Sequence, residues 1–302
     1  MTENPSLSTA VPAIALNSGT TIPQLGLGTW PLDDAEVERA IVAAAEIGYR
    51  HVDTAAKYGN ETGVGRGIRA SGLARDDWFV TTKLDGGYQG DDRAVAGLDA
   101  SLHRLGLDYV DLLLIHWPLP ARDQYVSTWR TFIELQQSGK ARAIGVSNFK
   151  PAHLDRLIAE TGVTPAVNQI ELSPAIPRLE QRAYGVEHGI VTESWSPIGG
   201  SGDLLASPVL ASLAGKHGRT PGQIVLRWHV QNGLVAIPKS RNPQRMAENL
   251  AVFRLRARHR RSRSARRARP RPRRGRRLRP HRALSRPRVS AALTRAPAAT
   301  AR

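Results

Sequence analysis

The 302-residue sequence contains no cysteine. A disulfide scaffold, a cysteine-ligated zinc site and a thiolate nucleophile are therefore excluded. The sequence also lacks any apolar run near the ~20 residues needed to cross a bilayer, and its first five residues do not have the basic and then apolar layout of a signal peptide. We therefore expect a cytoplasmic protein that does not enter a membrane.

Acidic residues are absent from the last 52 positions, which contain 20 arginines and no lysine. All 26 Asp and Glu lie in residues 1–250 with 23 of the 43 Lys and Arg, so this region carries a formal charge of 23 − 26 = −3. The formal net charge of +17 therefore belongs to the end of the chain. Residues 1–250 have the charge balance of an ordinary enzyme, and a strongly basic partner-binding surface is not expected on them.

Short apolar runs alternate with amphipathic helical stretches through residues 1–250, and the alternation repeats eight times. The predicted strands are Leu25–Gly28, Tyr49–Asp53, Trp78–Lys83, Tyr109–His116, Ala143–Ser147, Ala166–Gln169, Ile190–Ser194 and Val235–Pro238. The predicted helices include Asp34–Ile47, Ala94–Leu105, Ser127–Ser138, Pro151–Glu160, Leu179–His188 and Pro221–Gln231. This rhythm favours the α/β class and a (β/α)8 TIM barrel. The alternative, a doubly wound dinucleotide-binding sheet, would need a G-x-G-x-x-G turn that the sequence lacks.

Two features complete the predicted barrel domain. Ala13–Leu16 and Thr21–Pro23, joined by a Gly-containing turn, predict an N-terminal β-hairpin that closes the N-terminal mouth of the barrel. The glycines of Gly63–Gly67 lie inside a helical pattern, which we interpret as a loosely packed helix.

Residues 254–302 are dominated by Arg, Pro and Ala, so we place the end of the barrel domain at residue 253 and expect a disordered C-terminal tail. We favour a shifted reading frame as its origin. One C inserted into TTC GAC TTC GAG CTC GAC converts Phe-Asp-Phe-Glu-Leu-Asp into Phe-Arg-Leu-Arg-Ala-Arg, the sequence of Phe253–Arg258. The alternatives are a solvated tail without function and a cationic arm that binds nucleic-acid phosphates. Charge runs have low specificity, so nucleic acid is not an expected partner.

The working residues of a (β/α)8 barrel lie at the carboxyl ends of its strands. These positions hold Asp53, Lys83, His116, Ser147 with Asn148, Gln169, Trp195 and Lys239. Alone, Asp53 could cap a helix, Lys83 could lie on the surface and His116 could be a core histidine. Their occurrence on three adjacent strand ends favours a catalytic set.

Tyr58 lies five residues after Asp53, on the loop that would fold over this set. A buried ammonium at Lys83 would lower the pKa of Tyr58 from about 10 toward the working range of a general acid. His116 would contact an oxygen atom that gains charge. These groups can protonate a carbonyl oxygen but include no activated nucleophile and no metal cage, so the set requires a reductant.

The other strand ends predict a nicotinamide cofactor. Ser147, Asn148 and Gln169 can hold a carboxamide, Trp195 can stack on a ring, and the loop Ser196, Pro197, Ile198, Gly199 and beyond can donate backbone hydrogen bonds to a pyrophosphate. Lys239, Ser240, Arg241 and Arg245 lie at the start of the last helix, a natural anion site. Three cationic groups favour a 2′-phosphate and therefore NADPH over NADH. A solvated helix start is the structural alternative.

Several separate motifs then resemble those of the aldo-keto reductases, and of their bacterial 2,5-diketo-D-gluconate reductase branch in particular. They are Gly48–Ala55 with Tyr58–Glu61, Thr81–Leu84, Leu114–Pro118, Gly145–Phe149, and Ile237–Ser240 with Arg245, Glu248 and Asn249. The motifs occur in order at fitting distances over residues 13–253.

The resemblance implies a catalytic tetrad of Asp53, Tyr58, Lys83 and His116, with Tyr58 as the proton donor. It implies reduction of aldehydes or ketones by NADPH, including diketo-sugar acids or α-dicarbonyls. For the cofactor site, the resemblance adds Glu248 and Asn249 to the residues named above. For the substrate pocket, it implies a lining of Trp30 and Trp117 together with Tyr58 and His116. A small carbonyl substrate, no metal and a monomer are expected.

Family members usually continue with a further helix and a loop that closes over the substrate, where this sequence has its Arg-rich segment. A reductase impaired by that altered end is therefore one alternative. Another is a barrel that binds the cofactor and signals through an interface without catalysis, as some relatives do. The complete tetrad favours catalysis.

Overall fold

Eight parallel strands form the central sheet and follow one another around it in chain order. The computed structural model describes residues 11–200 and 203–254. The strands are β3 (Leu27–Gly28), β4 (His51–Asp53), β5 (Phe79–Leu84), β6 (Val110–Ile115), β7 (Ala141–Ser147), β8 (Val167–Glu171), β9 (Val191–Trp195) and β10 (Val235–Ala236). The first and last strands meet, because the backbone N–H of Ala236 donates to Gln24 O at 3.1 Å and that of Gly26 donates to Ala236 O at 2.9 Å. The predicted (β/α)8 barrel is confirmed.

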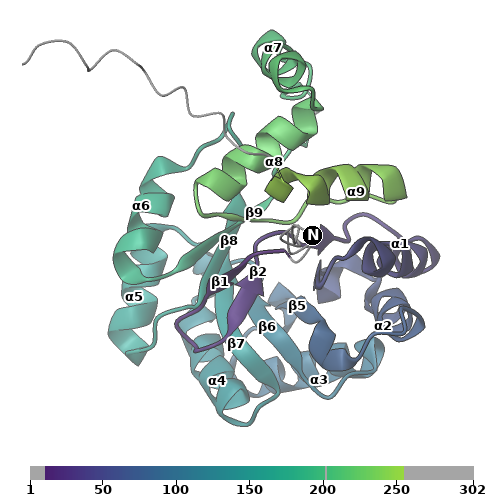
Figure 1. Cartoon of the computed structure of the whole chain (residues 1–302). Helices are drawn as coiled ribbons and strands as arrows, with labels where there is room; N and C mark the ends of the chain where they lie inside the picture. Colours follow the sequence, from purple (N-terminus) through teal and green to yellow (C-terminus); the bar gives the residue numbers. More distant parts are fainter. Residues whose placement is uncertain (1–10, 201–202, 255–302) are drawn as a thin grey trace, which may run out of the picture. The chain divides into compact units, whose positions relative to one another are not determined.

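Helices lie outside the strands (Figure 1). They are α1 (Asp34–Ile47), α2 (Glu61–Ala70), α3 (Asp91–Leu105), α4 (Tyr125–Gln137), α5 (Pro151–Thr161), α6 (Leu179–His188), α7 (Pro208–His217), α8 (Pro221–Gln231) and α9 (Pro243–Leu250). The predicted bounds of α1, α6 and α8 are confirmed, and capping boxes mark the starts of α1 and α8. Asp33 caps α1 by accepting from Glu36 N at 2.8 Å, and Gly48 ends that helix at φ +112°. Helix α7 was not among the predicted helices.

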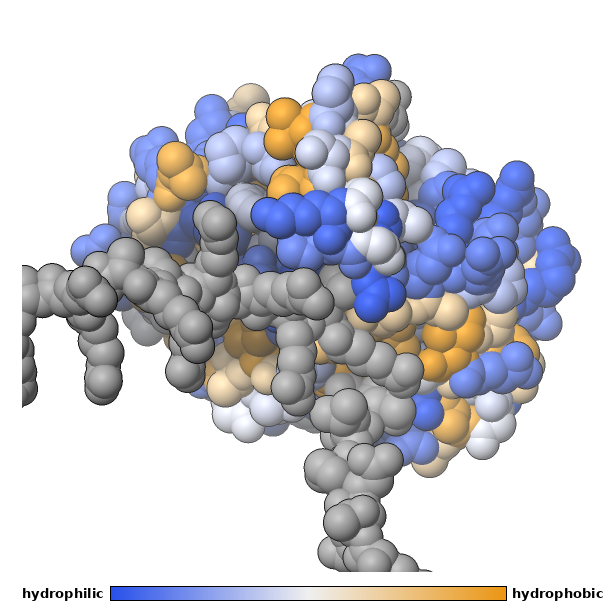
Figure 2. Space-filling view, turned by 45° about the horizontal axis from the view of Figure 1, so that its top comes forward, coloured by the Kyte–Doolittle hydropathy of each residue, from blue (hydrophilic) through white to orange (hydrophobic). Residues whose placement is uncertain are grey.

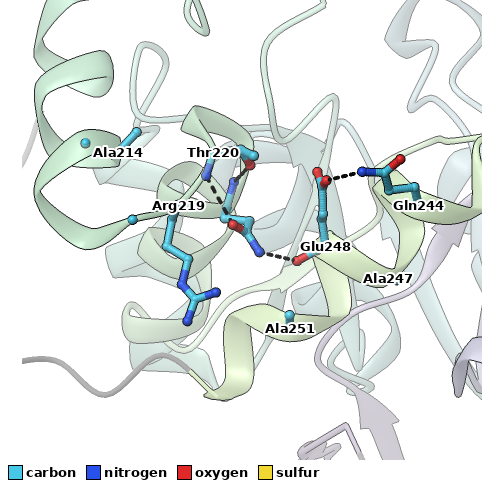
Figure 3. A pocket seen from close by; sticks show the side chains of 10 residues that line it. Ala214, Arg219, Thr220, Gln244, Ala247, Glu248 and Ala251 are labelled. Atoms are coloured by element: carbon cyan, nitrogen blue, oxygen red, sulfur yellow. Dashed lines mark hydrogen bonds between the residues drawn. The ribbon is translucent and has the colours of Figure 1, made fainter.

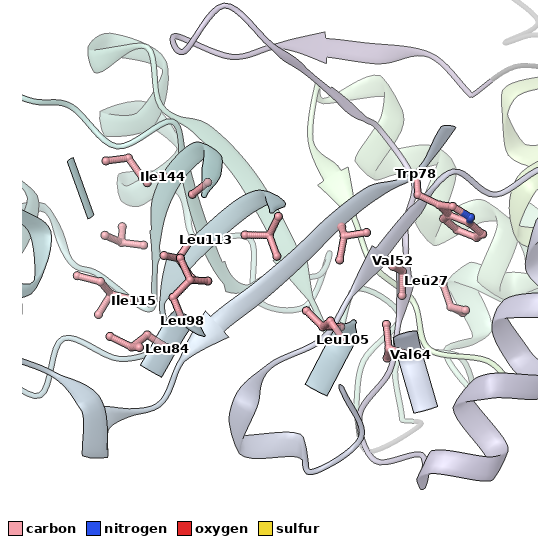
Figure 4. Packing of buried hydrophobic residues seen from close by; sticks show 14 of the residues in the cluster. Leu27, Val52, Val64, Trp78, Leu84, Leu98, Leu105, Leu113, Ile115 and Ile144 are labelled. Carbon is pink, nitrogen blue, oxygen red and sulfur yellow. The ribbon is translucent and has the colours of Figure 1, made fainter. Parts of the chain in front are cut away.

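The apolar strands are buried on both faces, as a parallel sheet inside a ring of helices requires. Leu112 and Leu114 of β6 pack inside the barrel, whereas Leu113 and Ile115 of the same strand pack against the helix layer. Figure 4 shows Leu113 and Ile115 beside Leu98 of α3 in that outer layer.

The predicted hairpin is confirmed as β1 (Ala13–Ala15) and β2 (Thr21–Pro23), which pair antiparallel. Ile22 is fully buried and belongs to the same hydrophobic cluster as Leu112 and Leu114, so the hairpin closes the floor of the barrel. Asn17 Nδ2 holds the hairpin turn by donating to Thr164 O at 3.2 Å.

The prediction of loose packing around the glycines of α2 is wrong. A Cβ atom on Gly63 would lie 2.3 Å from Asp34 O, and one on Gly65 would lie 1.9 Å from Leu105 O. The glycines therefore let α2 approach α1 and α3 more closely than any side chain would allow.

The surface turned forward in Figure 2 mixes hydrophilic residues with separate hydrophobic groups. Within residues 11–200 and 203–254, no helix is long and apolar enough to cross a membrane. Apart from Arg254, the tail predicted for residues 254–302 lies outside the described residues. Its origin in a shifted reading frame remains a hypothesis, which sequencing of the gene around the codon for Phe253 would test.

Candidate active site

The carboxyl ends of the barrel strands surround a cavity of about 690 Å³. Its lining brings together most of the predicted site residues: Trp30, Asp53, Tyr58, His116, Trp117, Ser147, Asn148, Gln169, Trp195, Ser196, Pro197, Ile198, Gly199, Lys239 and Arg245. Lys83 lies directly beneath, only 1% exposed. Trp30 and Trp117 form the outer walls and are 57% and 48% exposed.

A buried ion pair joins β4 to β5 at the base of the cavity. Lys83 Nζ donates to Asp53 Oδ1 at 2.5 Å, to Thr54 O at 2.9 Å and to the hydroxyl of Tyr58 at 3.3 Å. Burial alone would lower the pKa of Lys83, but the carboxylate of Asp53 raises it above its usual range. The ammonium therefore stays charged and holds the Tyr58 hydroxyl in place.

The expectation that the pKa of Tyr58 falls below its ordinary value is wrong, although Lys83 does act in that direction. Burial raises the pKa of this phenol above its ordinary value; the charge of Lys83 opposes that rise, and the charge of Asp53 reinforces it. Because Asp53 lies against the ammonium, it cancels much of the field that Tyr58 would otherwise feel. Tyr58 is therefore a neutral, fully protonated phenol near pH 7, as a proton donor must be.

His116 follows β6 and stands edge-on to Tyr58, with 5.7 Å between the ring centroids. Burial lowers the pKa of His116 to about 4, and the positive charge of Lys83 contributes. The imidazole is therefore neutral near pH 7. It can contact a substrate oxygen by a hydrogen bond but adds no positive charge.

Another part of the cavity lining is a hydrogen-bonded group of Trp195, Asn148 and Ser147, which fixes the ring of Trp195. Trp195 Nε1 donates to Asn148 Oδ1 at 2.9 Å, and Asn148 Nδ2 donates to His116 O at 3.1 Å and Ser147 Oγ at 3.0 Å. Asn148 adopts φ +66°, in the left-handed region that Asn tolerates better than most residues. Both ends of the Asn148 amide are thus occupied by protein groups.

Gln169 lies between two carboxyl groups in the barrel centre. Its Nε2 donates to Asp53 Oδ2 at 2.7 Å and to Glu193 Oε2 at 2.8 Å. Both hydrogens of the amide nitrogen are therefore taken, and the amide oxygen is the polar atom left for the cavity. Gln169 presents an acceptor there, which suits the NH2 of a carboxamide.

Four residues predicted to contact the cofactor do not line this cavity: Ser240, Arg241, Glu248 and Asn249. Arg241 pairs with Glu36 of α1. Glu248 lines a second cavity, of about 590 Å³, among α7, α8 and α9, where its Oε1 accepts from Gln244 Nε2 at 3.4 Å (Figure 3). Of the three predicted cations, Lys239 and Arg245 thus reach the main cavity.

Comparison with known proteins agrees with this geometry. The model of the aldo/keto reductase family matches residues 23–260. The chain belongs to this family. An aldo-keto reductase of Mycolicibacterium smegmatis is 53% identical over 242 residues, covering 80% of this chain and 88% of the relative. The methylglyoxal reductase DkgA of Escherichia coli K12 is 50% identical over 247 residues, covering 80% and 88%.

Two solved structures have the same fold as this chain. The aldo/keto reductase of Brucella melitensis superposes with a TM-score of 0.79 at 50% sequence identity, and the match covers 82% of this chain and 95% of the Brucella chain. A variant of Gox0644 in complex with NADPH superposes with a TM-score of 0.78 at 46% sequence identity, and the match covers 81% of this chain and 88% of the Gox0644 chain.

The cavity lining also includes Thr29, Pro31 and Lys57, which the sequence does not predict as site residues. Two buried residues behind the lining are missed as well. Asn60 is fully buried beside the loop that carries Trp30, and its place directly after Tyr58-Gly59 was the available signal. Glu193 is buried and hydrogen-bonded to Gln169; its place as the one charged residue of the predicted strand Ile190–Ser194 is the available signal.

Proposed function

We propose that this aldo/keto reductase reduces small aldehydes, ketones and especially α-dicarbonyls to alcohols with NADPH, and that diketo-sugar acids are related substrates. The observation that carries the proposal is the buried connection of Asp53, Lys83 and Tyr58, beside His116 and below two aromatic walls. Methylglyoxal, for which the relative DkgA is named, belongs to this substrate class.

The chain's own residues handle the proton. A carbonyl oxygen placed between Tyr58 and His116 accepts a hydrogen bond from each, so its carbon becomes more electrophilic. Tyr58 then gives its hydroxyl proton to that oxygen, and the remaining phenolate faces the ammonium of Lys83, which stabilises it. Asp53 keeps Lys83 charged throughout. When bound, NADPH supplies the hydride that the carbonyl carbon receives.

The cavity fits such a cofactor. Gln169 offers a carbonyl oxygen for a carboxamide, and the ring of Trp195 is held in a fixed plane by Asn148. Lys239 and Arg245 line the same cavity and supply positive charge for a phosphate. In this proposal Ser240, Arg241, Glu248 and Asn249 contact the cofactor only after rearrangement, which for Arg241 includes leaving Glu36.

The test follows the loss of NADPH absorbance with methylglyoxal and repeats it with NADH. We expect NADPH to be preferred, and Arg245→Gln to reduce that preference roughly tenfold or more, since a charge-assisted hydrogen bond contributes about 1.5–3 kcal/mol. Arg219→Gln, which changes a residue of the second cavity, is the matched control and should keep the preference. Equal use of NADH by the unaltered protein would overturn the assignment of the phosphate site.

The same assay separates the alternatives. Binding of NADPH without turnover of any carbonyl would favour a cofactor-sensing barrel, and weak turnover without selectivity would favour a reductase impaired by its altered C-terminal segment. We propose a monomer in the cytoplasm, which size-exclusion chromatography and cell fractionation would test.

A further inference from the structure

Asn60 begins α2 but does not cap it. Asn is a favoured N-cap residue because its side chain can accept from the first backbone N–H groups of a helix, yet the Asn60 side chain makes no such bond. It is fully buried and points instead toward the loop that follows β3. The side chain therefore has a purpose other than starting the helix.

The Asn60 side chain makes three hydrogen bonds to residues outside α2. Asn60 Nδ2 donates to Thr29 O at 3.2 Å and to Leu32 O at 2.8 Å, the two carbonyls that flank Trp30 and Pro31. Asn60 Oδ1 accepts from Thr54 Oγ1 at 2.8 Å. Two donors facing two carbonyls, with an acceptor facing a hydroxyl, require an amide at this position.

These bonds join the substrate wall to the catalytic strand end. Thr54 follows Asp53, and its carbonyl accepts from Lys83 Nζ at 2.9 Å. The ring of Trp30 lies 5.3 Å from that of Tyr58, centroid to centroid. More than half of Trp30 is exposed, so its own packing holds it only in part. The distance between this wall and the proton donor therefore depends on Asn60.

We infer that Asn60 is a positioning residue that determines substrate specificity: it clamps the Trp30 loop against the Asp53–Tyr58 segment and keeps the cavity narrow, which favours small, unbranched dicarbonyls over bulky ones. The inference deepens the proposed function and rests on it for the identity of the substrates. The clamp itself is independent of any substrate.

The experiment compares methylglyoxal with phenylglyoxal, which present the same dicarbonyl with a small and a large substituent. In Asn60→Ser, the side chain no longer spans to both carbonyls. We expect the ratio of kcat/KM for the two substrates to move about tenfold toward phenylglyoxal, a change of about 1.4 kcal/mol, because the Trp30 loop loses the bonds that hold it close to Tyr58. The change should lie in KM, with kcat for methylglyoxal within about threefold, since Tyr58 keeps its contacts. The dissociation constant of NADPH should not change.

Two controls separate positioning from a general loss of structure. Asn168→Ser removes another buried amide clamp, in which Nδ2 donates to Phe149 O at 3.1 Å, and should lower stability without moving the substrate ratio. In a Trp30→Ala background, Asn60→Ser should no longer alter the ratio, because the wall that it positions is gone. The inference would be overturned if Asn60→Ser alone left the ratio of kcat/KM for the two substrates unchanged. It would also be overturned if Asn60→Ser shifted that ratio equally in the unaltered and the Trp30→Ala backgrounds.

A readout without turnover keeps the inference distinct from the proposed function. Quenching of Trp30 fluorescence by acrylamide, isolated by subtracting the Trp30→Phe protein, should increase in Asn60→Ser. If the unaltered protein reduces neither dicarbonyl, the proposed function fails while this measurement still tests the clamp. Should Asn60→Ser not fold, Thr54→Val, which frees the Asn60 amide to turn, must increase quenching in the same direction, and no increase would refute the clamp.

Discussion

Replacing Glu193 by glutamine should make the stability of the barrel less dependent on pH. Burial raises the pKa of Glu193 from 4.5 to about 8, and the neighbouring charge of Asp53 adds to the rise. Its Oε1 has no hydrogen-bond partner among the described residues and lies 3.7 Å from His51 Nε2. A proton on this oxygen is therefore favoured in the folded protein.

The sign follows from which state holds the proton. Between pH 4.5 and about 8 the folded protein retains a proton on Glu193 that the unfolded chain has released. The free energy of unfolding must then fall as pH rises through this window. At about 1.4 kcal/mol per pH unit, the window gives an upper limit on the order of 5 kcal/mol, and relaxation around the carboxyl group will make the effect smaller.

Glutamine keeps the shape of the side chain and can still accept from Gln169, but it does not titrate. The free energy of unfolding of Glu193→Gln relative to the unaltered protein should therefore increase by a few kcal/mol from the acidic to the alkaline end of that window. Urea unfolding at a series of pH values measures it. Groups that lie far from Glu193 titrate alike in both proteins and cancel in the difference.

Ser194→Ala is the matched control. It alters a hydroxyl on the same strand that is buried and has no hydrogen-bond partner within the described part of the chain, and it introduces no change in titration. Its stability relative to the unaltered protein should not vary with pH. A constant difference for Glu193→Gln across the window would refute the reasoning, because Glu193 would then be ionised in the folded protein and compensated by a charged His51.

Two further predictions concern catalysis and packing. Tyr58→Phe should lower kcat by roughly 10²–10⁴-fold, measured by steady-state kinetics, while a fluorescence titration finds NADPH binding nearly unchanged; a rate near that of the unaltered protein would mean that another group gives the proton. Gly65→Ala should lower the free energy of unfolding by about 1–3 kcal/mol, despite the gain of roughly 1 kcal/mol in helix propensity, because the new Cβ would lie 1.9 Å from Leu105 O. An unchanged urea midpoint would contradict the close approach of α2 to α3.

The barrel could be predicted because its signals are local. Apolar strands recur at regular spacing, and helix ends carry their own caps, such as Asp33 and Gly48 at the two ends of α1. The strand-end rule then places Asp53, Lys83 and His116 at one mouth without any tertiary information. In a barrel whose strands follow one another in chain order, the residue at the end of each strand lies at the same mouth, so these residues meet as expected.

The predictions that are wrong or incomplete have a different cause: each concerns a residue whose environment is set by a neighbour distant in sequence. The sequence around the glycines of α2 predicts loose packing, because the contacts that require glycine are made with Asp34 and Leu105 of other helices. The position of Arg241 at a helix start predicts a phosphate contact, but its charge is paired with Glu36, which lies far away in the sequence. Asn60 looks like an ordinary helix start until the loop around Trp30 is placed against it.

The sign of the pKa shift at Tyr58 depends on the same kind of information, and it changes how the site works. A lone buried ammonium would favour the phenolate and reduce the population of the acid. In this barrel Asp53 compensates Lys83 before substrate binds, and the raised pKa of Glu193 leaves that side chain neutral near pH 7, so the buried set carries almost no net charge. Tyr58 therefore keeps its proton until a carbonyl oxygen gains negative charge. When the proton moves, the new phenolate lies 3.3 Å from Lys83 Nζ, and the ammonium stabilises the product of the transfer more than the resting phenol. That difference between the two states is what accelerates a reaction, while burial and the charge of Asp53 keep Tyr58 protonated before the transfer.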